Sequence, residues 1–287
     1  MLAVFRKEMK TYFSSITGYI FMGFFLLLSG FFVTLSNLLR GNPDYNGVLS
    51  SINFVFLFVV PILTMRLMSE EKKQQTDQLL LTSPLNIWDI VLGKYLAAVG
   101  VFLMTLLITC IYPIMMSFFG ELAWAEIIGG YVGFFLLGCA FISVGLFASS
   151  KTDNQVISAV VTFSILLFIW LLDGIQQGIP VGIVYGVVFA GIIVAALAML
   201  TFSATKNKIV GVITGLVGLA IMAIVYFLKP QIYAALIGNV FSWFSLLNRY
   251  QGFAMGVLSL SPIIYYITFS LAFLFLTVQG IDKKRWV

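Results

Sequence analysis

Residues 181–200 read VGIVYGVVFAGIIVAALAML and decide the class of this protein. The stretch contains no charged residue, and every face of a helix built from it is apolar. About 20 helical residues cross a hydrocarbon core of about 30 Å, so this segment predicts a membrane-spanning helix. Runs of the same kind recur from Ile16 to the C-terminus. The sequence therefore predicts an all-α polytopic membrane protein.

The composition of the whole chain supports this class. Of the 287 residues, 61% are hydrophobic and 9% are charged, and the mean hydropathy is +1.07. Soluble domains are typically about 45–50% apolar and about 25% charged, which excludes a water-soluble fold. A transmembrane barrel would show alternating segments of about ten residues, and segments such as 20–28 do not alternate.

Several residue types and motifs are missing. There is no histidine, and the two cysteines, Cys110 and Cys139, each lie inside an apolar run. These facts argue against a zinc site, a histidine-ligated haem and a disulfide scaffold, so we expect no metal or cofactor bound directly. The chain has no GxxxxGK[ST], GxSxG or HExxH motif, and we expect it not to be an enzyme by itself.

Apolar runs bounded by polar clusters predict about eight transmembrane helices. The first run exceeds a signal-peptide core and lacks a small-residue cleavage site, so it is interpreted as a retained span. The predicted spans cover residues 16–36, 51–68, 91–118, 127–149, 156–172, 181–203, 209–228 and 261–280.

The distribution of basic residues predicts the orientation. An even number of spans places both termini on one side, and that side then holds 13 of the 16 Lys and Arg residues. Because Lys and Arg are retained in the cytoplasm during insertion, both termini are predicted to be cytoplasmic. This asymmetry and anionic lipid account for the net charge of +5 without a nucleic-acid partner. The basic residues predicted inside are Arg6, Lys7, Lys10, Arg66, Lys72, Lys73, Lys94, Lys151, Lys206, Lys208, Lys283, Lys284 and Arg285; Arg40, Lys229 and Arg249 fall outside.

The connection between the second and third spans, residues 69–89, is longer and more polar than a simple loop needs. Residues 69–82 lack Gly and Pro, so we expect a helix that begins near Glu70 and Glu71 and ends before Pro84. Asn86 is a candidate cap for the helix that leads into the third span. A charged helix joined to two spans could act as a lever for a cytoplasmic protein, and the alternative is an ordinary solvated loop.

The N-terminal segment 1–15 is predicted to form a second helix of this kind, lying flat on the inner leaflet. Leu2, Phe5, Met9, Tyr12 and Phe13 recur at helical spacing. The remaining positions carry charges, namely Arg6, Lys7, Glu8 and Lys10. The alternative is a basic topology signal with no further role.

Two regions near the C-terminus are treated separately. Residues 181–228 predict a helical hairpin, rich in glycine and alanine, that faces lipid at the periphery. Residues 239–260 contain Trp243, Asn248 and Arg249 and predict an amphipathic segment at the outer interface.

The predicted span interiors contain essentially no Asp, Glu, Lys or Arg, although ion-coupled carriers usually place such groups at membrane depth. Energy for transport would then have to come from another protein. An ion-coupled carrier is the alternative that this observation disfavours.

Five stretches of the sequence allow a comparison with known families. They are Arg6-Lys7-Glu8 through Tyr19, Pro61 through Pro84, Val91-Leu92-Gly93-Lys94-Tyr95, Gly145 through Gln155 with Ser149-Ser150, and Phe244 through Trp286. Together they resemble the permease subunits of ABC-2-type transporters, in particular the branch of gliding-motility-associated permeases. The resemblance covers nearly the whole chain, and residues 61–84 are its most specific part.

The resemblance implies a type V exporter-like core of six spans, to which the hairpin 181–228 is an addition. It implies an interfacial helix with Phe5, Arg6, Lys7 and Met9. It also implies a cytoplasmic coupling region over residues 70–84, which contains Glu70, Glu71, Asp77, Leu81 and Pro84. We expect Glu70 and Glu71, with Asp77 in support, to be an electrostatic contact or an internal brace through which the ATPase subunit moves the membrane helices; the alternative is that they only stabilise the end of a helix.

The partners implied by the resemblance are two separate P-loop ATP-binding subunits, which would hold ATP and Mg, and a second permease copy or paralogue. The expected location is a bacterial-type cytoplasmic membrane, and the expected activity is export of an amphipathic substrate. The alternative is a non-transporting subunit that transmits ATPase-driven motion to an accessory protein on the outer face.

Overall fold

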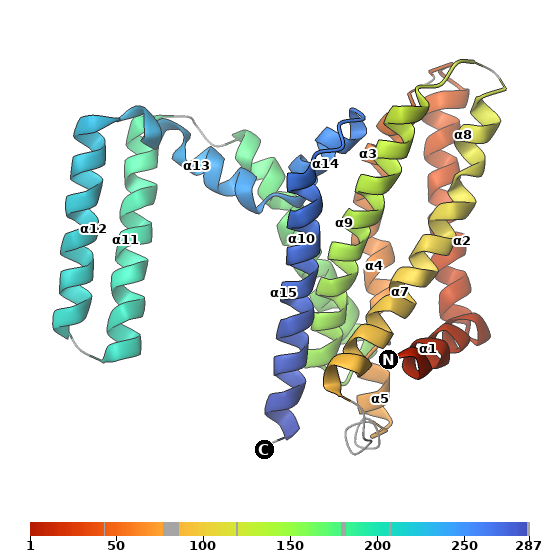
Figure 1. The fold of residues 1–287 in the computed structure, drawn as a ribbon, viewed down its shortest axis with the longest axis horizontal. Helices are drawn as coiled ribbons and strands as arrows, with labels where there is room; N and C mark the ends of the chain where they lie inside the picture. Colours follow the sequence, from red (N-terminus) through yellow and green to blue (C-terminus); the bar gives the residue numbers. More distant parts are fainter. Residues whose placement is uncertain (43, 77–85, 119, 179–181, 207, 286–287) are drawn as a thin grey trace. The chain divides into compact units, whose positions relative to one another are not determined.

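The computed structural model describes residues 1–42, 44–76, 86–118, 120–178, 182–206 and 208–285, and the regular structure in these ranges is helical (Figure 1). Contacts divide the chain into two compact units. Unit 1 comprises Met1–Ile169 and Leu246–Val287, and unit 2 comprises Trp170–Ser245. The N-terminus and the carboxyl end of the last helix, at Arg285, both belong to unit 1 and lie at the same end of it (Figure 1).

The prediction of eight spans is confirmed. Within the described ranges, eight helical segments are long and apolar enough to cross a membrane, and each overlaps one predicted span. They are Ile16–Leu38, Tyr45–Lys73, Ile87–Met116, Trp124–Lys151, Gln155–Leu172, Ile183–Ser203, Ile209–Leu228 and Leu260–Lys283.

Unit 1 contains most of the helices, and one helix runs from unit 1 into unit 2. The elements of unit 1 are α1 (Leu2–Ser14), α2 (Ile16–Val33), the π-helix η1 (Thr34–Leu38), α3 (Tyr45–Ile52), the 3-10 turn η2 (Asn53–Val55), α4 (Phe56–Thr64), α5 (Ser69–Lys73), α7 (Ile87–Thr109), α8 (Ile111–Met116), α9 (Trp124–Lys151), α14 (Leu246–Ala254) and α15 (Leu260–Arg285); α10 (Gln155–Gly178) crosses the boundary.

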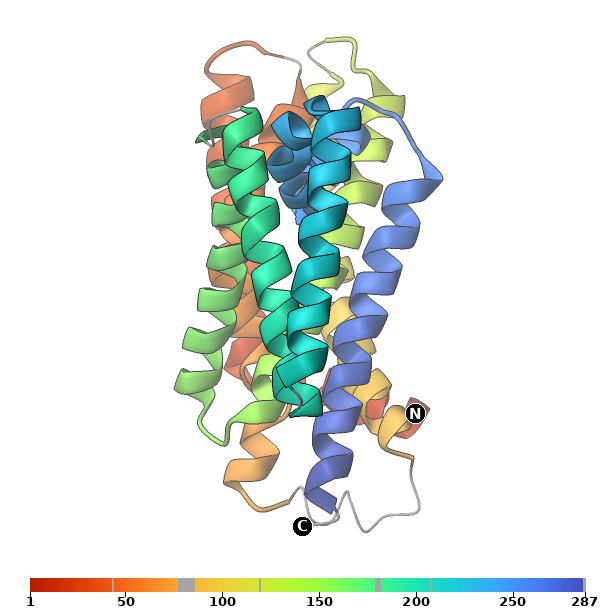
Figure 2. The same ribbon diagram turned by 90° about the vertical axis from the view of Figure 1, so that its left-hand side faces the viewer.

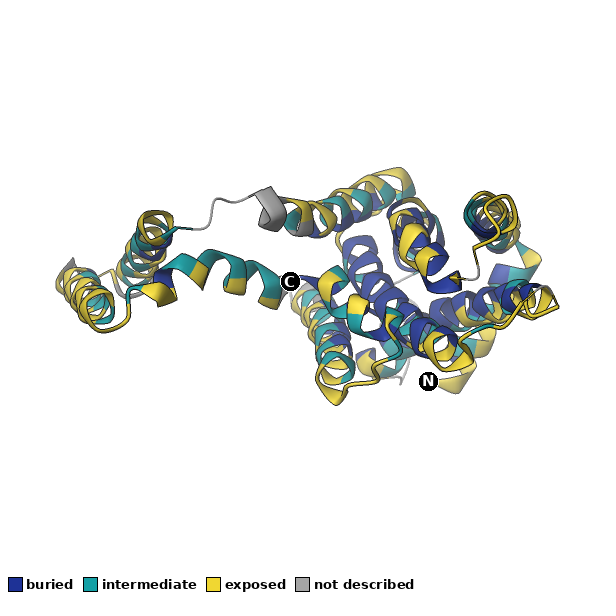
Figure 3. Cartoon of the chain, turned by 90° about the horizontal axis from the view of Figure 1, so that it is seen from above, coloured by how far each residue is buried: buried dark blue, intermediate teal, exposed yellow. Residues whose placement is uncertain are grey.

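Helix α9 is the centre of unit 1, because α3, α4, α7, α14 and α15 all pack against it. Its glycines permit these close approaches. A Cβ atom on Gly133 would lie 2.5 Å from the Cβ atom of Phe253 in α14, and a Cβ atom on Gly138 would collide with the Phe102 ring of α7. Phe56 and Phe134 stack with their ring centroids 4.6 Å apart. Buried residues accordingly gather where these helices face one another (Figure 3).

Unit 2 is built from α11 (Ile183–Thr205), α12 (Lys208–Leu228) and α13 (Gln231–Phe244). The two long helices pack as an antiparallel pair (Figure 2), which confirms the predicted helical hairpin. Gly218 meets Val194 within this pair, and Gly186 packs against the backbone of Tyr233 in α13. Most other side chains of α11 and α12 are exposed and apolar, as expected of helices in lipid.

The helix predicted over residues 69–82 ends earlier than expected, at Lys73. Gln75 has a φ of +55°, the N–H of Thr76 bonds to the carbonyl of Glu71, and the N–H of Gln75 bonds to the carbonyl of Lys72. These two bonds form a Schellman motif, which stops a helix by satisfying its last carbonyls. The motif usually contains glycine at the left-handed position, and glutamine there explains why the sequence pattern missed it.

The packing of α9 leads to a test of unit 1. Gly133→Ala should lower the free energy of unfolding by about 1–3 kcal/mol, because the added methyl group has no room beside Phe253. Gly23→Ala in α2 is the matched control, since no atom lies within 4 Å of its added Cβ, and it should be neutral or stabilising. Unfolding of both variants in one detergent measures the difference, and equal stabilities would contradict the packing.

Candidate functional site

The most unusual side chain in unit 1 is Lys94, which lies in the second turn of α7 and is only 1% exposed. Its ammonium group lies 2.7 Å from Oε1 of Glu8 in α1 and 2.9 Å from Oε2 of Glu71 in α5. Removing a charge from water costs several kcal/mol unless close partners compensate. Two carboxylates supply that compensation here, and they come from two other helices.

Glu71 also binds a second lysine. Its Oε1 atom accepts a hydrogen bond of 2.8 Å from Nζ of Lys7. Lys7, Glu8, Glu71 and Lys94 thus form an ionic cluster with two positive and two negative charges. Partial burial would lower the pKa of Lys7, but the hydrogen bond to Glu71 and the charges of Glu71 and Glu8 outweigh it and raise the pKa.

Helix α1 reaches this position because one of its faces fits against α7. Val4, Glu8 and Tyr12 recur every four residues and are buried. Gly93 leaves room for Val4, and the hydroxyl group of Tyr12 donates a 2.7 Å hydrogen bond to the carbonyl of Leu63 in α4. Burial raises the pKa of Tyr12, so this hydroxyl remains a donor at neutral pH.

Glu70, next to Glu71, forms a different ion pair. Its carboxylate binds Arg66 through two bonds of 2.6 and 3.0 Å, and Arg66 also donates to the hydroxyl of Thr17 in α2. Bidentate Arg–carboxylate pairs hold their geometry more firmly than single contacts. The two adjacent glutamates therefore connect α5 to different helices, Glu71 to α1 and α7 and Glu70 to the start of α2.

The structure brings together only some of the residues predicted for the site. Glu70, Glu71 and Lys7 take part in ion pairs, whereas Arg6 is exposed. Phe5 and Met9 are half-buried and lie against Gly100 of α7. Asp77, Leu81 and Pro84 lie outside the described residues.

Two sequence predictions need correction around Lys94. The sequence pattern groups Glu8 with the charged residues outside the apolar face of the N-terminal helix, but Glu8 is only 8% exposed, because it neutralises Lys94. The span interiors were expected to lack ionisable groups, yet Lys94 lies within the span Ile87–Met116. The sequence signal for this buried charge is the position of Lys94, one turn inside the apolar run 91–118. The distribution of basic residues instead groups Lys94 with the cytoplasmic ones.

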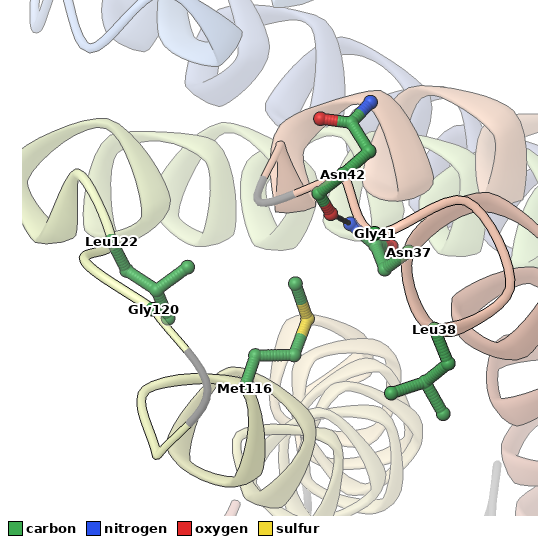
Figure 4. Close-up of a pocket in the computed structure, with 7 residues that line it drawn as sticks. All are labelled: Asn37, Leu38, Gly41, Asn42, Met116, Gly120 and Leu122. Carbon is green, nitrogen blue, oxygen red and sulfur yellow. Dashed lines mark hydrogen bonds between the residues drawn. The ribbon is translucent and has the colours of Figure 1, made fainter.

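A cavity of about 300 Å³ (Figure 4) lies at the end of unit 1 that is opposite to α1 and α5 (Figure 1). The amide of Asn37 there donates a 2.7 Å hydrogen bond to the carbonyl of Asn42. The described residues that line the cavity have no ionisable side chain: they are Asn37, Leu38, Gly41, Asn42, Met116, Gly120 and Leu122. We therefore place the candidate site at the ionic cluster.

Among the described residues, no group of three or more Cys, Asp and Glu side chains could hold a metal ion. The chemistry that the ionic cluster offers is charge pairing between helices. The fold is that of a polytopic helical membrane protein. Residues 40–172, slightly less than half of the chain, match the family model described as ABC-2 family transporter protein. This match supports a membrane permease of an ABC transporter, the component that is distinct from the ATPase. No curated protein matches the chain.

The two lysines that bind Glu71 allow a matched test of the cluster. Lys94→Met should lower the free energy of unfolding by about 3–5 kcal/mol, because it leaves Glu8 and Glu71 buried with less compensation. Lys7→Met should change it by less than about 1 kcal/mol, because the Lys7 side chain is 58% exposed. Denaturant titration in mixed micelles would measure both, and a similar small effect for the two variants would contradict the assignment.

Proposed function

We propose that this chain is the membrane-spanning permease subunit of an ABC transporter that exports an amphipathic substrate. Two separate P-loop subunits supply the ATPase activity, with ATP and Mg bound on them, and a second permease copy or paralogue completes the complex. The family match over residues 40–172 and the eight candidate spans support the permease class. The lack of a phosphate-binding motif in the sequence agrees with a separate ATPase.

The ionic cluster is the observation that carries the proposal. Helix α5 has five residues and is bound through Glu71 to α1 and α7. The same segment has an exposed surface, which is formed by Lys73, Gln74 and Gln75. A partner that pushes on this surface would therefore move α5 together with the helices to which Glu71 is bound.

The orientation follows from the charge distribution. The end of unit 1 that carries α1 and α5 is the cytoplasmic one in this proposal, because it holds most of the basic residues. The contact with the ATPase subunit extends from Glu70 and Glu71 through Asp77, Leu81 and Pro84. Helix α1, with Phe5, Arg6, Lys7 and Met9, lies along the inner leaflet of a bacterial-type cytoplasmic membrane.

Transport in this scheme needs two arrangements of the permease. ATP can shift the equilibrium between them only by as much as it binds one arrangement better than the other. Closure of the ATPase subunits on ATP would displace α5, and the ionic cluster would carry that displacement into α7. The interface between the two permeases would then rearrange and release the substrate outside.

The first test uses the purified chain with and without a candidate P-loop ATPase subunit from the same source. The chain alone should not hydrolyse ATP, whereas the reconstituted complex should hydrolyse it and move a fluorescent lipid-like probe across vesicles. Hydrolysis by the pure chain would overturn the proposal. Stimulated hydrolysis without flux of any probe, together with a bound outer-face protein, would favour transmission of motion to that protein instead.

The second test compares neighbouring carboxylates by the same substitution. Glu71→Gln should reduce ATPase stimulation by about tenfold or more, because it weakens a desolvated pair that joins three helices. Glu70→Gln should have a smaller effect, since the partner of Glu70 lies four residues away in the same segment. Amounts of assembled complex must be equal in both variants. Wild-type stimulation by Glu71→Gln would show that this carboxylate only supports the local helix.

A further inference from the structure

The segment Gly145 through Ser150 of α9 is distinctive in the sequence, and the ionic cluster does not include it. Gly145 and Ser149 lie one turn apart on the face of α9 that meets α4 and α5. A Cβ atom on Gly145 would collide with the side chain of Thr64, so the absence of a side chain allows the end of α4 to approach. Ser149 is fully buried at the same contact.

The hydroxyl group of Ser149 forms three hydrogen bonds with the backbone of the turn between α4 and α5. It accepts hydrogen bonds from the backbone N–H groups of Met68, at 3.0 Å, and Ser69, at 3.2 Å. It also donates a bond of 3.2 Å to the carbonyl of Met65. A hydroxyl group has one donor and two acceptor positions, so the turn uses its whole hydrogen-bonding capacity.

A second contact holds the other end of α5. Nζ of Lys72 donates to the carbonyl of Ser150 and lies 4.0 Å from the carboxylate of Asp153. This places a cation at the carboxyl end of α9, where the helix dipole favours it. Both ends of α5 are thus tied to the last turn of α9, independently of the ionic cluster.

We propose that Ser149 is a positioning residue that fixes the turn between α4 and α5 to α9, so that a displacement of α5 reaches α9 directly. This inference rests on the proposed function for the origin of the displacement. It adds a second route beside the ionic cluster, which acts on α1 and α7. Because α9 contacts α14 and α15, the second route leads into the centre of unit 1.

The test compares Ser149→Ala with Ser143→Ala. Both serines lie in α9 and are fully buried, but the hydroxyl of Ser143 bonds only to the carbonyl of Ala140 in its own helix. Hydrogen exchange of the full-length chain in nanodiscs reports on the amides of Met68 and Ser69. Ser149→Ala should speed their exchange by about fivefold or more, the change expected for loss of one ordinary hydrogen bond, and Ser143→Ala should not.

The functional readout is ATPase stimulation in the assembled complex. Ser149→Ala should reduce it severalfold at normal assembly, and Ser149→Thr, which keeps the hydroxyl group, should restore part of it. Unchanged exchange at Met68 and Ser69 would overturn the positioning role. Faster amide exchange at Met68 and Ser69 together with wild-type ATPase stimulation would overturn the proposal that displacement of α5 acts through α9. If the wild-type chain stimulates no ATPase, the proposed function fails, and exchange alone then decides whether Ser149 positions the turn.

Discussion

The buried charge of Lys94 is the constraint that organises the terminus-bearing end of unit 1. A lysine in an apolar span must be neutralised or leave the span, and both available counter-charges lie on other segments. Glu8 holds α1 against α7, and Glu71 holds α5 in the same place. One buried charge therefore contributes to the position of both the N-terminal helix and the short helix after the second span. An apolar residue at position 94 would leave Glu8 and Glu71 without the buried cation that joins α1 and α5 to α7 at this point.

The second constraint is how closely other helices can approach α9. Among the described residues it contacts at least six other helices, α3, α4, α5, α7, α14 and α15, and the residues at several contacts are glycines, so neighbouring side chains and backbones come close to its axis. In lipid, association of helices relies on such close packing and on hydrogen bonds, because apolar burial alone gives little preference for protein over lipid. The bonds of Ser149 and the glycine contacts act together in this way. A helix with small residues on several faces can serve as the shared support of a bundle.

The sequence predicts the spans well because hydropathy is a local property, which can be read from consecutive residues without knowledge of their tertiary contacts. Residues 181–200 or 127–149 need no partner to be recognised as apolar. The sequence pattern singles out Glu71 and Lys7 in two separate charged segments but predicts no pairing between them, and the burial of Glu8 depends on Lys94, 86 residues later. The early end of α5 was missed because a glutamine occupies a position where glycine is the usual signal. What the sequence could not provide was the pairing of distant charges.

The boundary between the two units agrees with the extent of the family match. The family match ends at residue 172, and the contacts divide the chain between Ile169 and Trp170. The chain returns to unit 1 at Leu246, and α14 and α15 then pack against α9. Two independent criteria thus cut the chain at nearly the same place. Unit 2 has its own helix–helix contacts, so substitutions that disturb the packing of α11 against α12 should leave the packing of the helices around α9 unchanged.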